Sequence, residues 1–134
     1  MGENGRGFYI KNSGKTFKRF EHIKKRRDFE NLREKGKRLK SNNYVLIFTK
    51  NDFSYSRLAI NVSKKIGNAA IRNYEKRICR EIYRDIKNRL PAGFDFLIIV
   101  RKATGREAKK GSENFTSAFS ERKTELIGLF NRIV

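Results

Sequence analysis

The sequence predicts an α+β fold, an α/β two-layer sandwich in which helices pack on a small central sheet. Two observations lead there. Runs rich in β-forming residues occur at 44–50, 56–62 and 94–100, and segments with helical apolar spacing lie before, between and after them. The chain has 134 residues, of which 37% are hydrophobic. This length and composition suit one domain with one core, without need of disulfides or a structural metal.

The N-terminal part divides into an arm and a first helix. Residues 1–16 are polar and rich in glycine without a period, so we expect a flexible arm followed by a single domain over 17–134. The segment HIKKRRDFENLREKG then predicts a short helix. Asp28 suits its first turn, and Gly36 suits its C-terminal end.

Strands follow the first helix. YVLIFTK (44–50) and SRLAINV (56–62) flank the turn residues Asn51 and Asp52, and we expect them to form a hairpin. Residues 37–41 are a candidate for a further short strand. The nearly all-apolar run at 94–100 predicts a buried strand.

The segment between the last two of these strands is the most regular helix of the sequence. At about 100° per residue, one side collects Ile71, Tyr74, Ile78, Ile82 and Ile86. The other side collects Arg72, Asn73, Lys76, Arg77, Arg80, Arg84 and Lys87. The acids of the helix lie at or near the apolar side and its borders. An ordinary surface helix mixes both signs of charge, so a face of one sign favours phosphate binding. A last helix is predicted from Phe115 to Ile133.

The loop before the central helix adds to its basic face. Lys64 and Lys65 precede the helix, and Asn68 with the free N–H groups near Ala69 lies at the helix N-terminus, where the dipole attracts phosphate. The whole chain has 33 Lys and Arg against 14 Asp and Glu, a formal charge of +19. This charge predicts a polyanionic partner.

The composition weighs against several other classes. Cys79 is the single cysteine and His22 the single histidine, and no Cys/His zinc spacing or nucleophile–base pair stands out. We expect no catalytic residues and no bound metal in the protein, and a cytoplasmic location. Two rivals remain: an RNA-binding module such as a ribosomal protein or RNA chaperone, and a protein that binds anionic membrane surfaces. The membrane interpretation fits poorly because the core needs the apolar face of the central helix.

The run SKKIGNAAIRNYEKRICRE (63–81) resembles the signature of the bacterial ribonuclease P protein family, K-K-x-G-x-A-x-x-R-N-R-x-K-R-x-x-R. The matching positions are Lys64, Lys65, Gly67, Ala69, Arg72, Asn73, Lys76, Arg77 and Arg80. Tyr74 departs from the family pattern, which has arginine there. The resemblance extends from about Phe17 to Ile133.

This resemblance implies the element order α-β-β-β-α-β-α with a left-handed crossover through the central helix. It also implies a protein subunit that binds a catalytic RNA, with one protein per RNA, and assists removal of the 5′ leader of precursor tRNA. In this family the RNA subunit performs the hydrolysis with Mg²⁺, and the protein alone is inactive. No membrane partner is expected.

A second surface is predicted between the first helix and the sheet. The alternation of the strands would turn Val45, Ile47, Ala59 and Asn61 toward Phe29 of the helix, where they line either a cleft or plain core. The family resemblance favours a cleft for the single-stranded leader, with an aromatic ring at the position of Phe29. Arg33 and Ile47 depart from the aromatic residues that relatives carry, and an arginine can stack on a base or hold a phosphate.

Overall fold

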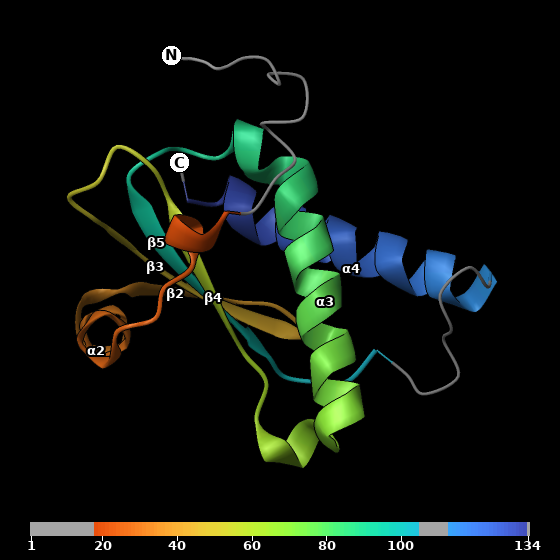
Figure 1. Ribbon diagram of the computed structural model, residues 1–134. Helices are drawn as coiled ribbons and strands as arrows, with labels where there is room; N and C mark the ends of the chain where they lie inside the picture. Colours follow the sequence, from red (N-terminus) through yellow and green to blue (C-terminus); the bar gives the residue numbers. More distant parts are fainter. Residues whose placement is uncertain (1–17, 105–112, 134) are drawn as a thin grey trace.

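A computed structural model of the protein describes residues 18–104 and 113–133, except for the side chains of 113–117 (Figure 1). Its elements in chain order are η1 (Arg19–Glu21), α2 (Arg26–Lys35), β2 (Lys37–Lys40), β3 (Tyr44–Lys50), β4 (Arg57–Asn61), η2 (Lys64–Ile66), α3 (Ala69–Ile86), η3 (Lys87–Arg89), β5 (Phe94–Val100) and α4 (Glu113–Asn131). The α+β class and the order α-β-β-β-α-β-α are confirmed, and the candidate strand at 37–41 forms as β2. The arm expected at 1–16 lies outside the described residues.

The four strands form one sheet in the order β2-β3-β5-β4. β2 pairs antiparallel with β3, and β3 pairs antiparallel with β5. β4 pairs with β5 in parallel, with Leu58 opposite Phe96. The predicted hairpin between 44–50 and 56–62 is therefore wrong, because β5 lies between the two strands. β5 is apolar on both faces, which suits a central place in the sheet.

Helix α3 makes the connection between the parallel neighbours β4 and β5 (Figure 1). Parallel strands cannot be joined by a tight turn, so the chain needs a crossover of this length. The left-handed sense of the crossover stays a prediction.

Helices cover both faces of the sheet, and the two-residue period of the strands separates two clusters. On one face, Leu46 and Phe96 pack with Ile78 of α3 and with α4. On the other face, Ile47 and Leu97 pack with Leu32 of α2. Figure 1 shows α2 on the opposite side of the sheet from α3 and α4.

Gly36 allows α2 to end close to the sheet. A Cβ atom at this position would lie 2.4 Å from the Leu32 carbonyl oxygen and 2.6 Å from a side-chain carbon of Ile47. The glycine predicted from the sequence as the end of the helix is therefore required by the close approach of α2 to β3.

Candidate nucleic-acid interface

Local interactions fix where α3 begins. The side-chain oxygen of Asn68 accepts a hydrogen bond from the Ile71 N–H at 3.0 Å, which caps the helix. Gly67 lets the preceding loop pass close to Ile71, because a Cβ there would lie 2.8 Å from that side chain. The N–H groups of Ala69 and Ala70 have no acceptor within the helix and remain as donors for an anion.

The predicted basic face of α3 lies at the surface. Six of its seven predicted polar side chains are exposed or half-exposed and face solvent: Arg72, Asn73, Lys76, Arg77, Arg80 and Arg84. The opposite side of the helix, with Ile78, Ile82 and Ile86, is buried in the core. The helix is thus divided into two faces as the periodicity predicts.

The acidic residues of α3 are each bound within the protein. Buried Glu75 accepts hydrogen bonds from Thr104 N–H at 2.6 Å and from the Thr104 hydroxyl at 2.8 Å. Asp85 pairs with Lys123 at 3.1 Å. Glu81 lies 3.7 Å from Arg77, so it borders the basic face without neutralising the rest of it.

Two residues of the signature are partly covered. The Nε atom of Arg72 is buried and has no hydrogen-bond partner among the described residues. An unpaired buried donor is costly, so the Arg72 guanidinium is a group that would gain from an added acceptor. Tyr74, where the family pattern has arginine, packs against the main core cluster, in agreement with its predicted place near the apolar stripe.

One cation of the predicted basic face, Lys87, is engaged within the protein. The Lys87 ammonium lies 2.6 Å from a carboxylate oxygen of Glu21, and its side chain is only 14% exposed. The prediction that Lys87 lies on the free outer face is wrong, because η1 packs against the end of α3 and pairs with it. Lys64 and Lys65, at the other end of the helix, are exposed.

The second predicted surface lies beside α2. Across the sheet, Val45, Ile99 and Asn61 form one row of neighbours, and Ile47, Leu97 and Ala59 form the next row. All three residues of the first row are half-buried, whereas those of the second row are buried beneath α2. The helix therefore covers the second row and leaves the first row partly exposed.

This arrangement corrects the prediction made for Ile47. Its side chain is fully buried between α2 and the sheet, and Gly36 packs against it. The prediction that Ile47 lines the cleft is wrong, because its side chain is buried beneath α2, as is that of Ala59. Val45 is half-buried, but it is not among the residues that line the cleft.

A cleft of about 440 Å³ opens at this place, lined by Lys24, Arg26, Phe29, Arg33, Ile60, Asn61 and Leu97. Phe29, Arg33 and Asn61 are brought together as predicted, with Phe29 half-buried and Arg33 exposed. The sequence analysis missed Lys24 and Arg26. The run of cations at 24–27 was their signal in the sequence.

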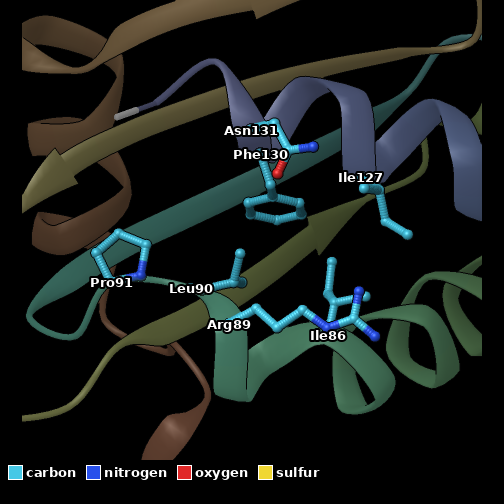
Figure 2. Close-up of a pocket in the computed structure, with 7 residues that line it drawn as sticks. All are labelled: Ile86, Arg89, Leu90, Pro91, Ile127, Phe130 and Asn131. Carbon is cyan, nitrogen blue, oxygen red and sulfur yellow. The ribbon is translucent and has the colours of Figure 1, made fainter.

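A smaller hollow of about 140 Å³ lies on the other side of the sheet, between the end of α3 and α4. Figure 2 shows Phe130 of α4 pointing toward Leu90, with Ile86 and Ile127 beside them. Five of its seven lining residues are apolar, and Arg89 is the one charged residue among them. This hollow lacks the several cations of the cleft beside α2.

The described residues contain no group of three or more His, Cys, Asp or Glu side chains placed to hold a metal ion. Asp28 and Asp95 are bound to Arg57, and Glu21 is bound to Lys87, so these carboxylates do not converge on one point. The expectation that the protein itself holds no metal stays a prediction. Across the same part of the chain, no helix is long and apolar enough to cross a membrane.

The chain is similar to proteins of one known family. The family described as ribonuclease P matches residues 17–124. The ribonuclease P protein component of Petrotoga mobilis is 40% identical over 121 residues, covering 90% of this chain and 97% of that protein. The Thermotoga maritima protein of the same name is 42% identical over 95 residues, 71% of this chain and 81% of the other.

Solved structures agree with the sequence comparisons. The structure of the ribonuclease P protein from Thermotoga maritima matches with a TM-score of 0.69 and 40% identity, over 85% of this chain and 98% of that one. The Staphylococcus aureus protein matches with a TM-score of 0.62 and 29% identity, over 82% of this chain and 97% of that one.

Proposed function

The chain belongs to the bacterial ribonuclease P protein family, and we propose that its basic α3 face binds the RNA subunit of ribonuclease P while the cleft beside α2 binds the 5′ leader of precursor tRNA. The observation that carries this proposal is the pair of cationic surfaces at β4. β4 is an edge strand of the sheet. Its last residue, Asn61, lines the cleft, and Lys64 follows three residues later at the start of the α3 loop.

The two surfaces suit different forms of RNA. The α3 face offers several arginines on a rigid helix, and arginine forks fit phosphates and base edges. The cleft offers the half-buried ring of Phe29 with Lys24 and Arg33 near it. Such a combination of an aromatic ring and cations suits a single strand whose bases are free to stack.

We assign catalysis to the RNA subunit with its Mg²⁺. In support, the acidic side chains described above are engaged with cations or with hydrogen-bond donors and do not converge on one point. The protein contributes binding and positioning, and its positive charge reduces repulsion between two RNA molecules. One protein per RNA subunit, in the cytoplasm, is the proposed arrangement.

The test compares Arg77→Ala with Arg132→Ala. Both arginines are exposed, but Arg77 lies on the α3 face and Arg132 lies after the end of α4. Arg77→Ala should weaken binding to the ribonuclease P RNA by about 1–3 kcal/mol and lower the magnitude of the salt slope by about 1. Arg132→Ala removes the same charge and should have a smaller effect. Equal effects of the two variants would show that α3 provides only nonspecific charge.

Activity gives a second measurement. The purified protein alone should not cleave precursor tRNA with or without Mg²⁺, and it should restore cleavage by a cognate RNA subunit at low Mg²⁺. Cleavage at the mature 5′ end by protein that is rigorously free of RNA would overturn the assignment of catalysis to the RNA.

A further inference from the structure

Three aromatic rings form a partly exposed cluster beyond the cleft. Phe20 of η1 is 53% exposed and Phe53 is 44% exposed, the two exposed large hydrophobic residues among those described. The Tyr55 ring lies between them, 4.8 Å from Phe20 at 81° and 5.1 Å from Phe53 at 25°, measured between ring centroids. Exposed apolar clusters of this kind commonly mark binding surfaces.

The loop that carries Phe53 and Tyr55 is held in place by hydrogen bonds at both ends. The Asn51 side-chain oxygen accepts from Phe53 N–H at 2.8 Å, and its amide nitrogen donates to Asp95 at 2.8 Å. The Ser56 hydroxyl donates to the Pro91 carbonyl at 2.8 Å and accepts from Phe94 N–H at 3.1 Å. The rings are therefore presented on a fixed loop.

Arg57 packs against the same cluster through its guanidinium group. Its guanidinium carbon lies 4.7 Å from the centroid of the Phe53 ring. Asp95 and Asp28 hold the guanidinium at 2.6 Å and 3.3 Å. The hydrogen bond from Arg57 to Asp95 raises the pKa of Arg57 and outweighs burial, which would lower it, so the cation stays charged.

We propose that Phe20, Phe53 and Tyr55 form a second stacking site for single-stranded RNA, which extends the leader track beyond the cleft. This inference rests on the proposed function of the cleft. Aromatic rings beside cations bind single strands with little sequence preference, because every base has a face that can stack. Lys18 and Arg19, next to Phe20, are exposed, and Asp52 is the exposed acid of the loop.

The cluster is continuous with the cleft along the edge of the sheet. The chain after Phe20 runs beside edge strand β4, where His22 bridges to Leu58 and the Ile23 N–H donates to the Leu58 carbonyl at 3.0 Å. Lys24, which follows, lines the cleft. Four residues span at most about 14 Å, a gap that about four stacked nucleotides cover at 3.4 Å each.

Charge favours RNA over a second copy of the chain. Each copy carries a formal charge of +19, so two copies facing each other through this surface would repel. A polyanion would instead be attracted to the rings by the surrounding cations. The observations therefore favour a nucleic-acid strand on this surface over a homodimer contact.

The test uses precursor tRNAs with a short leader of about 4 nucleotides or a long leader of about 12 nucleotides, bound to the reconstituted holoenzyme. The double variant Phe20→Leu with Phe53→Leu keeps apolar side chains but removes two aromatic faces. We expect about 5- to 10-fold weaker binding of the long-leader substrate and little change for the short one. The double variant Phe20→Tyr with Phe53→Tyr keeps the rings and should bind both substrates as the unmodified chain does.

Phe29→Ala separates this inference from the proposed function. If Phe29→Ala weakens both substrates while the leucine variant changes neither, the cleft role holds and the second stacking site is refuted. If Phe29→Ala has no effect but the leucine variant weakens the long-leader substrate alone, the stacking site holds without the cleft. Equal weakening of both substrates by the leucine variant refutes it too. So does unchanged RNA binding with altered sedimentation or altered binding to anionic vesicles, which would assign the rings to a protein or membrane contact.

Discussion

Phe29 and Ile47 belong to the same apolar cluster beneath α2 but differ in exposure, because Phe29 is half-buried and Ile47 is fully buried. Phe29→Ala should weaken binding of a precursor tRNA with a leader by about 1–3 kcal/mol, the value of one stacked base, while mature tRNA binding stays nearly unchanged. The loss should be selective because the mature tRNA has no leader to place in the cleft. Binding to both RNAs and melting of the protein measure the effect.

Ile47→Ala is the matched comparison. It should cost about 2–5 kcal/mol of folding stability through loss of core packing. It should not discriminate between substrates once the protein is folded. If Phe29→Ala instead produced the large loss of stability and affected both RNAs alike, Phe29 would be a core residue and the cleft would lose its aromatic anchor.

Cys79 provides a probe of the core at α3. Burial raises the pKa of its thiol to about 12, and the nearby Glu75 carboxylate adds to the shift. The thiolate is the reactive form, so at pH 8 the native protein should react with a thiol reagent far more slowly than the protein in denaturant. Rapid labelling of the native protein at this pH would show that the packing of α3 on the sheet opens readily.

At the scale of elements, a single carboxylate joins α4 to the turn between β2 and β3. Glu125 accepts hydrogen bonds from the Asn43 N–H and side-chain amide, each at 2.7 Å, and from the Ser41 hydroxyl. Burial alone would raise the pKa of Glu125, but these hydrogen bonds outweigh it and lower the pKa. The ionised carboxylate is therefore the form that stabilises the contact.

The sign of this shift predicts a pH dependence. A carboxylate with a lowered pKa in the folded state contributes stability above its unfolded pKa, near 4.3 for glutamate, and loses it as the pH falls through the folded pKa. At pH 7, Glu125→Gln should therefore lower the melting temperature by a few degrees. The difference from the unmodified protein should shrink as the pH falls below about 4. A difference that is constant with pH would mean that the charge of Glu125 is not involved.

The sequence predicts the elements better than it predicts their pairing. The helices and strands follow from local patterns, and the apolar run at 94–100 marks a buried strand. Which strands become neighbours depends on contacts between distant residues. Asn51 and Asp52 look like a hairpin turn, but Asn51 instead binds Asp95 of β5, and the loop connects strands that do not pair.

The site residues show the same difference between what local patterns predict and what depends on contacts with distant residues. Helical periodicity correctly places Asn73 and Arg77 at the surface, because the apolar side of α3 alone decides that face. It fails for Lys87, because the partner Glu21 lies in a different element. Alternation along the strands correctly turns Ile47 toward α2, but it cannot tell which row of the sheet the helix covers.

For the whole molecule, edge strand β4 is where the proposed RNA contacts meet. Residues near its start carry the aromatic cluster, the cleft opens beside it, and the α3 loop follows its end. Because α2 covers one face of the sheet and α3 covers the other, the cleft and the α3 face lie on opposite sides of the sheet and come near each other only at its edge. In the proposed arrangement, the leader of precursor tRNA in the cleft and the RNA subunit on α3 would therefore approach each other at this edge.

Salt should act on folding and on RNA binding in opposite directions. The formal charge of +19 destabilises the compact free protein through repulsion among its own cations. Raising the salt concentration shortens the screening length from about 10 Å at 0.1 M, so the melting temperature of the free protein should rise by a few degrees. Over the same range the affinity for the RNA subunit should fall, because the counterions released on binding gain less entropy when the bulk salt concentration is higher. Melting curves and binding titrations in matched sodium chloride series measure both trends. A melting temperature that falls with salt would mean that pairs such as Lys87 with Glu21 and Arg57 with Asp95 contribute more to stability than the excess cations cost.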